Sequence, residues 1–355
     1  MRDQALAAAR TNRVVVLYNE GPAWSVRRLF ELREGEEEGL RTLRVRHRAS
    51  ALPRAGSVLA VGGLEAGLDR LRRDGFRPDV IHAHTLAAAA AALALGRAHR
   101  IPVVVSEHWS AFALRTLSTW EARLARLVFE RVDLVCPVSE RLREAVAAYA
   151  PRARLRVVGN PVDTALFASV RRRPPSPSGP ARLLAVGLLG EKKGMGRLLD
   201  ALAWRNGARP VVLDLVGEGP AAAELGRQAR ELGVGDTVRF RGLMAREDIA
   251  RLMGEVDLFV LPSLIETFGV ALVEALAAGL PVVATDVGVA REVVDERSGV
   301  VVPPDDVGAL AQAIEQALAR LPEYDPSGAA AVVRERFSPE AVGRQWDEVY
   351  RSVLG

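Results

Sequence analysis

The chain has 355 residues, one cysteine, and 48 Lys and Arg against 44 Asp and Glu, for a net charge of +4. This length favours two domains, the single cysteine excludes an internal disulfide framework, and aromatic residues at 5% with no interleaved basic run argue against nucleic acid as a partner. No apolar run is long enough to span a bilayer, and the first residues lack the apolar core of a signal peptide, so we expect a cytoplasmic protein.

The first half of the chain alternates short apolar runs with longer stretches rich in alanine and leucine. Residues 1–21 read as a helix followed by a strand. Nearly continuous apolar strands separated by helices are typical of parallel sheets covered on both faces. We therefore expect a Rossmann-like domain over residues 1–170, with strands at 13–18, 79–84, 102–108, 133–139 and 155–160.

Cysteine and histidine within these predicted strands raise the question of a metal site. Cys136 stands in an apolar run and is interpreted as a small core residue. His82 and His84 share one face of a strand, but no third or fourth ligand is near them in the sequence. We therefore predict no metal site.

A linker is predicted at residues 171–180, because RRRPPSPSGP contains three arginines, four prolines, two serines and a glycine. The alternation resumes over 181–337, which we interpret as a second Rossmann-like domain. Ser338 and Pro339 predict the start of a final helix, 338–355. The expected fold is α/β, with two doubly wound domains facing a cleft and second-domain strands at 182–187, 211–217, 237–242, 257–263 and 281–286.

Charge is distributed unevenly along the chain. Residues 1–170 contain 26 arginines and 18 acidic residues, a net +8, whereas the remainder carries a net −4. A basic first half suggests an anionic partner, such as a membrane surface or an acidic acceptor. The alternative is a solvated, arginine-rich surface without a partner.

The densest motif occupies residues 257–288, where an apolar strand, a short loop and a helix follow one another. The helix start offers free N–H groups and the positive end of a dipole, which suit an anion. Glu266 and Glu274 would accept hydrogen bonds from hydroxyl groups, and a ligand that combines phosphate with hydroxyls is a nucleotide sugar. The donor-binding candidates here are Glu266, Thr267, Phe268, Gly269, Val270 and Glu274.

Lys192 and Lys193 are the only lysines in a chain with 46 arginines. They follow a predicted strand and a glycine-rich turn that begins at Gly187, at the end of the strand where ligands bind. Lysine is a compact charge on a flexible stem, and the planar guanidinium of arginine does not replace it directly. We therefore predict that these residues bind pyrophosphate, beside a second loop that contains Gly217 and Gly219.

Several of these segments resemble those of a known protein family. Residues 262–288, PSLIETFGVALVEALAAGLPVVATDVG, resemble the donor-site signature of glycosyltransferase family 4, retaining enzymes with the GT-B fold. The segment VGLLGEKKGMGRLLDAL, 186–202, is similar to the family's phosphate-binding lysine loop. Further similar segments are 215–220, 238–263 and 296–306, and less specifically 79–85, 101–112, 133–140 and 157–167.

The resemblance implies roles for individual residues. Lys193 would grip the donor diphosphate, Glu274 would hold the nucleotide ribose, and Glu266 would contact the transferred sugar. His108 falls at the position of the family's cleft-facing histidine, so His108, Lys193 and Glu266 are the catalytic candidates. The last helix would cross back onto the first domain. No D-x-D triplet occurs in the chain, which points to a metal-independent transferase without a cofactor.

Three departures from the family pattern stand out. The chain reads GLLG at 187–190 where an arginine is usual, and we expect Lys192 to compensate. Gly288-Val289 replaces a Gly-Gly pair. The opening strand and its glycine loop are not recognisable, so we expect a further segment of roughly 20–30 residues, one strand plus a loop, before Met1.

The sequence therefore predicts an enzyme that moves a sugar from a nucleotide diphosphate sugar to an acceptor hydroxyl with retention. Polysaccharide or glycolipid synthesis is the expected setting, with a glycan, lipid-linked or small-molecule acceptor and a peripheral position on the inner face of the membrane. Two alternatives remain open: a catalytically impaired nucleotide-sugar-binding protein, and an epimerase or hydrolase on the same fold.

Overall fold

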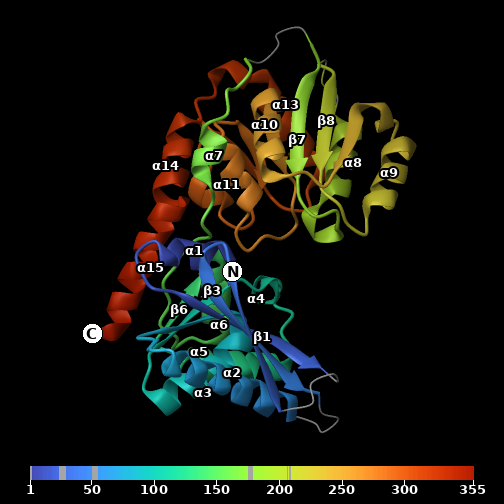
Figure 1. Cartoon of the computed structure of the whole chain (residues 1–355). Helices are drawn as coiled ribbons and strands as arrows, with labels where there is room; N and C mark the ends of the chain where they lie inside the picture. The colour runs from blue at the N-terminus through green and yellow to red at the C-terminus, as the bar shows by residue number, and fades with distance from the viewer. Residues whose placement is uncertain (1, 24–28, 50–54, 175–178, 206, 208) are drawn as a thin grey trace. The chain divides into compact units, whose positions relative to one another are not determined.

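The computed structural model describes residues 2–23, 29–49, 55–174, 179–205, 207 and 209–355. The chain forms two compact units (Figure 1). Unit 1 comprises Met1–Val138, Leu142–Val158 and Val342–Gly355, and unit 2 comprises Ser139–Arg141 and Gly159–Ala341. Residues 175–178 of the predicted linker lie outside the described residues.

Unit 1 contains two separate three-stranded sheets. One is parallel, in the order β4-β5-β6, and the other has the order β1-β3-β2, in which β1 is parallel and β2 antiparallel to β3. The strands are β1 (Val15–Ala23), β2 (Phe30–Glu37), β3 (Leu40–Arg48), β4 (Ile81–His84), β5 (Val103–Glu107) and β6 (Leu134–Pro137). The helices are α1 (Arg2–Ala9), α2 (Ala55–Arg73), α3 (Thr85–His99), α4 (Ser110–Leu114), α5 (Thr119–Phe129) and α6 (Glu140–Tyr149).

Four of the five strands predicted in the first half are confirmed, and the fifth, at 155–160, is wrong. That segment makes only an isolated bridge between Leu155 and Val135. Val158 still donates a backbone hydrogen bond to Pro137 of β6. Pro161 follows shortly afterwards and has no N–H to donate, so the pairing cannot continue as a strand.

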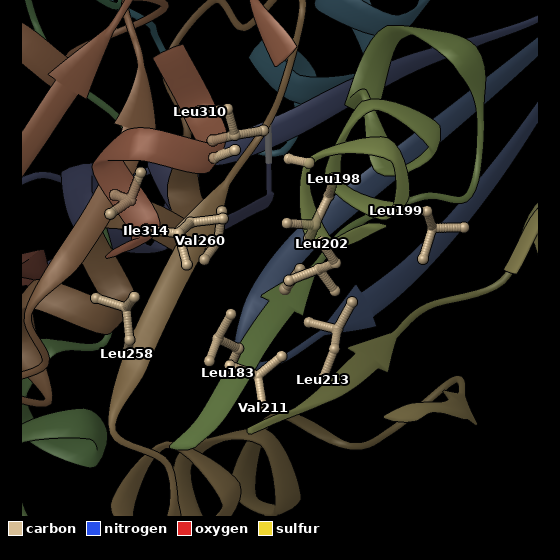
Figure 2. Close-up of a cluster of buried hydrophobic side chains, with 14 of the residues drawn as sticks. Leu183, Leu198, Leu199, Leu202, Val211, Leu213, Leu258, Val260, Leu310 and Ile314 are labelled. Atoms are coloured by element: carbon tan, nitrogen blue, oxygen red, sulfur yellow. The ribbon is translucent and has the colours of Figure 1, made fainter. Parts of the chain in front are cut away.

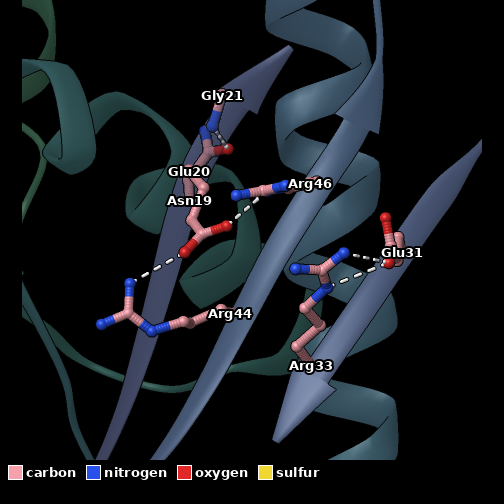
Figure 3. Close-up of polar contacts among 7 residues, drawn as sticks. All are labelled: Asn19, Glu20, Gly21, Glu31, Arg33, Arg44 and Arg46. Atoms are coloured by element: carbon pink, nitrogen blue, oxygen red, sulfur yellow. Dashed lines mark hydrogen bonds and ion pairs between the residues drawn. The ribbon is translucent and has the colours of Figure 1, made fainter. Parts of the chain in front are cut away.

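β2 and β3 were not predicted, because charged residues interrupt their apolar pattern. β3 buries Leu43 and Val45 on one face and places arginines on the other. Figure 3 shows Glu20 of β1 between Arg44 and Arg46 of β3, at 2.8 and 2.6 Å. Hydrogen bonds from these guanidinium groups lower the pKa of Glu20. The polar face of this sheet is therefore held by cross-strand ion pairs.

Unit 2 is built on one six-stranded parallel sheet, in the order β12-β11-β10-β7-β8-β9. Its strands are β7 (Ala181–Val186), β8 (Val211–Val216), β9 (Val238–Gly242), β10 (Leu258–Leu261), β11 (Val282–Thr285) and β12 (Gly299–Val302). The five predicted strands are confirmed, and β12 is additional. Its helices are α7 (Thr164–Ala168), α8 (Met195–Trp204), α9 (Ala222–Glu231), α10 (Arg246–Glu255), α11 (Val270–Ala277), α12 (Ala290–Val293), α13 (Val307–Ala319) and α14 (Ser327–Phe337).

Helices α8 and α13 cover one face of this sheet. Leu198 of α8 and Ile314 of α13 are fully buried against Leu183 of β7 and Val260 of β10 (Figure 2). Burying a leucine or isoleucine side chain contributes about 1.5–3 kcal/mol relative to leaving it exposed. The apolar residues of the strands that point to this face are therefore explained by the two helices packed on it.

The last helix, α15 (Pro339–Leu354), begins where the sequence predicts. The Ser338 hydroxyl accepts a hydrogen bond from the Ala341 N–H at 3.2 Å, so it caps the helix. From Val342 onward the helix belongs to unit 1, as the resemblance implies. Its fully buried Trp346 packs in a cluster with Cys136, and burial raises the pKa of that thiol to about 12. Cys136 is thus confirmed as a core residue.

Across the described part of the chain, none of the helices combines the length and the apolar character needed to cross a membrane.

Candidate functional site

The strand order of unit 2 reverses between β7 and β10, where an open parallel sheet is expected to form a crevice at the carboxyl ends of its strands. The chain runs outward from β7 to β8 and β9 on one side, and from β10 to β11 and β12 on the other. In open parallel sheets, ligands bind at the carboxyl ends of the strands where the strand order reverses. The loops after β7 and β10 contain most of the residues predicted to bind a donor.

The loops after β7 and β8 are joined by backbone hydrogen bonds. Gly187 donates to Val216 at 3.0 Å, and Leu189 donates to the Glu218 carbonyl at 2.8 Å. The approach is close enough that side chains are excluded. A Cβ on Gly217 would lie 1.9 Å from the Gly187 carbonyl oxygen, and one on Gly219 would lie 2.4 Å from that of Leu189. The two glycine-containing loops therefore form one surface.

Lys193 and Glu266, which are 73 positions apart in sequence, form an ion pair in this crevice. The distance from Lys193 Nζ to Glu266 Oε1 is 2.6 Å, and the Ser263 hydroxyl donates to the same oxygen at 2.9 Å. The methylene stem of Lys193 lies over Gly187, whose hypothetical Cβ would be 3.5 Å from the lysine Cδ. Their contact was not predicted, because the family resemblance assigns the two residues to different parts of a donor.

The lysine loop and the loop after β10 are also held together through the backbone. Lys192 accepts a hydrogen bond from the Leu264 N–H at 2.9 Å, while its side chain is exposed. Gly194 has a φ of 63°, and a Cβ there would lie 2.0 Å from the Pro262 carbonyl oxygen. The two lysines therefore differ: Lys193 extends over the crevice and Lys192 points its charge to solvent.

The start of α11 supplies backbone donors. Gly269 has a φ of 97° and caps the helix without a side chain, a conformation that favours glycine. In the part of the chain that the structure describes, the N–H groups of Phe268, Gly269 and Val270 make no hydrogen bond. Thr267 is half-buried beside them. Free donors at the positive end of a helix are a favourable place for an anion.

Glu274 lies one turn further along α11 and is buried, with 6% of its surface exposed. Arg246, at the start of α10, lies with its Nε 3.4 Å from a Glu274 carboxylate oxygen. Each of the two predicted glutamates is thus accompanied by a cation, Glu266 by Lys193 and Glu274 by Arg246. A ligand that bears both hydroxyls and phosphates can meet acceptors and donors at the same crevice.

His108 belongs to unit 1, where it follows β5. Glu107, which is fully buried, accepts hydrogen bonds from the His108 and Trp109 N–H groups at 2.8 and 2.7 Å, and so fixes the turn that holds His108. Burial raises the pKa of Glu107 to about 7, against the opposing effect of these backbone N–H groups. Burial also lowers the pKa of His108 to about 4, so its imidazole is neutral near pH 7.

Three imidazoles stack at the carboxyl ends of β4 and β5. The ring of His84 lies 4.6 Å from that of His82 and 5.7 Å from that of His108. The two nitrogens of His82 pair with Tyr350 and Ser106, both at 2.8 Å. Burial lowers the pKa of His82 to about 3 and lowers that of His84 as well. Among the described residues, no group of histidines, cysteines and carboxylates has an arrangement suited to a metal ion.

Several residues that complete these sites were not predicted from the sequence. Ser263 and Gly194 lie inside motifs that were singled out, so their position was available, but their contacts were not. A Cβ on Gly288 would lie 2.2 Å from the Phe268 carbonyl oxygen, which accounts for the glycine that is retained before Val289. The roles of Arg246 and Glu107 were not recognisable from the sequence, because a charged residue at the start of a helix or the end of a strand is common.

Two family models match adjacent parts of the chain. Residues 4–166 match Glycosyltransferase Family 4, and residues 167–326 match Glycosyl transferases group 1. The chain is 33% identical over 305 residues to a glycogen synthase of Mycobacterium tuberculosis, covering 80% of this chain and 71% of that protein. It is 32% identical over 325 residues to a phosphatidyl-myo-inositol mannosyltransferase of Mycobacterium leprae, covering 86% and 82%.

Solved structures agree in fold. Sucrose-phosphate synthase of Thermosynechococcus elongatus superposes with a TM-score of 0.77 at 22% identity, over 99% of this chain and 92% of that one. HepE of Anabaena in complex with UDP superposes with a TM-score of 0.72 at 25% identity, over 86% of both chains. The motifs at the crevice, the family models and these structures agree: the chain belongs to glycosyltransferase family 4 and has the GT-B fold.

Proposed function

We propose that this enzyme transfers a sugar from a nucleotide diphosphate sugar to an acceptor hydroxyl with retention of configuration. The observation that supports it most is the crevice of unit 2, where Lys193, Glu266 and the free N–H groups at the start of α11 come together. Solved structures of HepE in complex with UDP and with UDP-glucose support a nucleotide-sugar donor.

In this proposal the diphosphate binds between Lys193 and the start of α11. Lys193 then exchanges its contact with Glu266 for a phosphate oxygen, and Glu266 becomes available to a sugar hydroxyl. Fixed donors aimed at the leaving diphosphate stabilise the charge that develops as the glycosidic bond breaks. Glu274 holds the ribose hydroxyls. No metal is required for this role, since lysine and backbone donors provide the positive charge.

His108 is proposed as the group nearest the reacting sugar. Its neutral imidazole can accept or donate a hydrogen bond but carries no charge near pH 7, which suits contact with a sugar hydroxyl. Glu107 positions it by holding the preceding turn. For the acceptor we propose a cell-surface glycan or a lipid-linked sugar, and for the location the inner face of the membrane.

The donor site is tested by thermal shift with UDP-, GDP- and ADP-sugars. A ligand at 100 times its Kd stabilises the folded protein by about 2.7 kcal/mol, which raises the Tm of a unit of this size by roughly 5–10 °C. We expect one nucleotide to raise the Tm of the wild type. Lys193→Ala removes a charge-assisted hydrogen bond of about 1.5–3 kcal/mol, so it should weaken binding at least about tenfold.

Lys192→Ala separates the two lysines, because it removes the same charge one residue away from an exposed side chain. Its loss of the shift should be smaller than that of Lys193→Ala. Equal losses in both variants would contradict a specific role for Lys193, and no shift with any nucleotide sugar would contradict the donor site. Product analysis then decides the reaction: free sugar formed without acceptor would indicate a hydrolase, and the anomeric configuration of a transfer product reports retention.

A further inference from the structure

Helix α5 of unit 1 exposes an apolar and basic stripe to solvent. Trp120, Arg123, Leu127 and Arg131 follow one another at spacings of three and four residues, which places them along one face of the helix and its last turn. We name these four residues the α5 stripe. Trp120 is 68% exposed and Leu127 is 50% exposed, although the opposite face of α5 buries Ala125, Val128 and Phe129.

The acidic residues of α5 do not neutralise this stripe. Glu121 accepts hydrogen bonds from the Ser118 backbone and hydroxyl in a capping box, and Glu130 pairs with Arg126. Among the described residues, Arg123 has no carboxylate partner, and the guanidinium of Arg131 donates only to the Leu127 carbonyl. The stripe therefore combines two exposed apolar side chains with two uncompensated positive charges.

The arginines of the β1-β3-β2 sheet behave differently. Arg44 and Arg46 pair with Glu20, and Arg33 pairs with Glu31 (Figure 3). Much of the arginine excess of the first half is therefore compensated locally on that sheet. On α5 it is not, and this difference distinguishes the α5 stripe from a generally solvated arginine surface.

A shallow groove of about 650 Å³ continues from the end of the stripe. Arg131 lines it together with Arg97 and Arg100 from the end of α3, the helix that lies beside α5 (Figure 1). Asp79 and Asp133 also line the groove, but Asp133 already accepts a hydrogen bond from the Val103 N–H at 2.7 Å. Neither Arg97 nor Arg100 pairs with a carboxylate of the described chain. With three arginines against two aspartates, the groove extends the positive charge beyond the Arg131 end of the α5 stripe.

We propose that the α5 stripe and this groove dock the enzyme on an anionic phospholipid bilayer. Trp120 and Leu127 enter the boundary between headgroups and acyl chains, where an amphipathic ring is favoured, and the arginines contact lipid phosphates. An acidic protein would also complement this surface, since aromatic residues and arginine are enriched at protein interfaces, but the proposed lipid-linked acceptor favours the bilayer. The inference rests on the proposed membrane location of the acceptor and names the surface responsible.

The test is co-sedimentation with vesicles of equimolar phosphatidylglycerol and phosphatidylcholine, compared with vesicles of phosphatidylcholine alone. The full chain should bind the anionic vesicles at low ionic strength, and binding should fall as salt is raised. The double variant Trp120→Ser/Leu127→Ser should lower the partition coefficient at least about tenfold. Arg123→Gln/Arg131→Gln should lower it roughly twentyfold or more, because each arginine near an anionic surface contributes about 1 kcal/mol.

The matched control is Trp204→Ser/Leu243→Ser, which removes the same two residue types from exposed positions of unit 2, 57% and 78% exposed. It should bind vesicles as the wild type does. Wild-type binding that the α5 variants leave unchanged would overturn this surface. No wild-type binding at low salt would overturn membrane docking altogether. The Tm shift with the donor nucleotide, measured on the same variants, reports the proposed transferase site separately and should be unaffected.

Discussion

Substitution of Gly194 tests whether the lysine loop and the loop after β10 are packed as closely as the structure has them. An alanine Cβ at this position would lie 2.0 Å from the Pro262 carbonyl oxygen, whereas such contacts are essentially never below 3.0 Å. The loops must therefore separate by about 1 Å, more than the close packing of an interior absorbs without cost. The neighbouring contact between Lys193 and Glu266 is only 2.6 Å long and would be lost.

The expected magnitude follows from two contributions. Alanine in the left-handed conformation, at a φ of 63°, costs about 1–2 kcal/mol. Overpacking against a backbone carbonyl costs about 1–3 kcal/mol. Gly194→Ala should therefore lower the free energy of unfolding of unit 2 by about 2–5 kcal/mol, and it should also weaken donor binding because Lys193 is displaced.

Gly190→Ala is the control in the same loop. Gly190 has an extended conformation, φ −145° and ψ 163°, and nothing lies within 4 Å of its hypothetical Cβ. Alanine fits there and restricts the unfolded chain, so stability should rise by about 0.4–1 kcal/mol. Guanidinium unfolding and Tm measure both variants. Equal stability of the two variants, or a Gly194→Ala protein as stable as the wild type, would refute the close packing of these loops.

Three further predictions concern unit 1. Because the pKa of His82 is lowered to about 3 and that of His108 to about 4, both are neutral in the folded protein while the unfolded chain takes up protons below about pH 6.5. Their contribution to stability is complete above that pH and is lost as the pH falls toward 4. For His108 alone the loss in the free energy of unfolding is roughly 3 kcal/mol. The Tm should therefore drop between pH 7 and pH 5. The effect of Glu107 on stability has the opposite dependence on pH, because its pKa of about 7 in the folded protein lies above that in the unfolded chain. Its contribution to stability is present at acid pH and is lost as the pH rises through 7. Glu107→Gln should therefore gain stability relative to the wild type between pH 5 and pH 8, and a difference independent of pH would contradict the assignment. Trp346→Ala should lower the free energy of unfolding by about 3–5 kcal/mol, because it leaves a cavity in the core. Trp346→Phe should lower it much less, because the buried indole N–H has no partner among the described residues. Equal losses for the two variants in denaturant unfolding would contradict this.

The sequence by itself predicted the elements whose signal is local. Apolar runs marked nine of the strands, because strands buried on both faces admit few polar residues. Ser338 and Pro339 marked the start of α15, since a cap and a first-turn proline act within four residues. The glycine-rich turn, the isolated lysines and the loop with Glu266 indicated a donor site for the same reason: each motif is a short stretch with a distinct composition.

β2 and β3 were not predicted, because the stability of such charged strands depends on a partner strand. β3 is stable with arginines on one face only because Glu20 and other acidic residues lie opposite them. The segment 155–160 looked like a strand, yet it pairs with β6 over too few residues. The composition of a segment indicates which secondary structure it can form, whereas strand pairing depends on the residues of the neighbouring segment.

Contacts between distant residues were decided by the tertiary structure alone. The strand order of unit 2 brings the loops after β7 and β10 together, and only then does Lys193 meet Glu266 across 73 positions. The same holds for the pairing of Arg246 with Glu274 and for the stack of His84 on His108. Hydrogen bonds and ion pairs act over a few ångströms in space, so no local pattern of residues specifies them until the sheet has fixed which strand ends are neighbours.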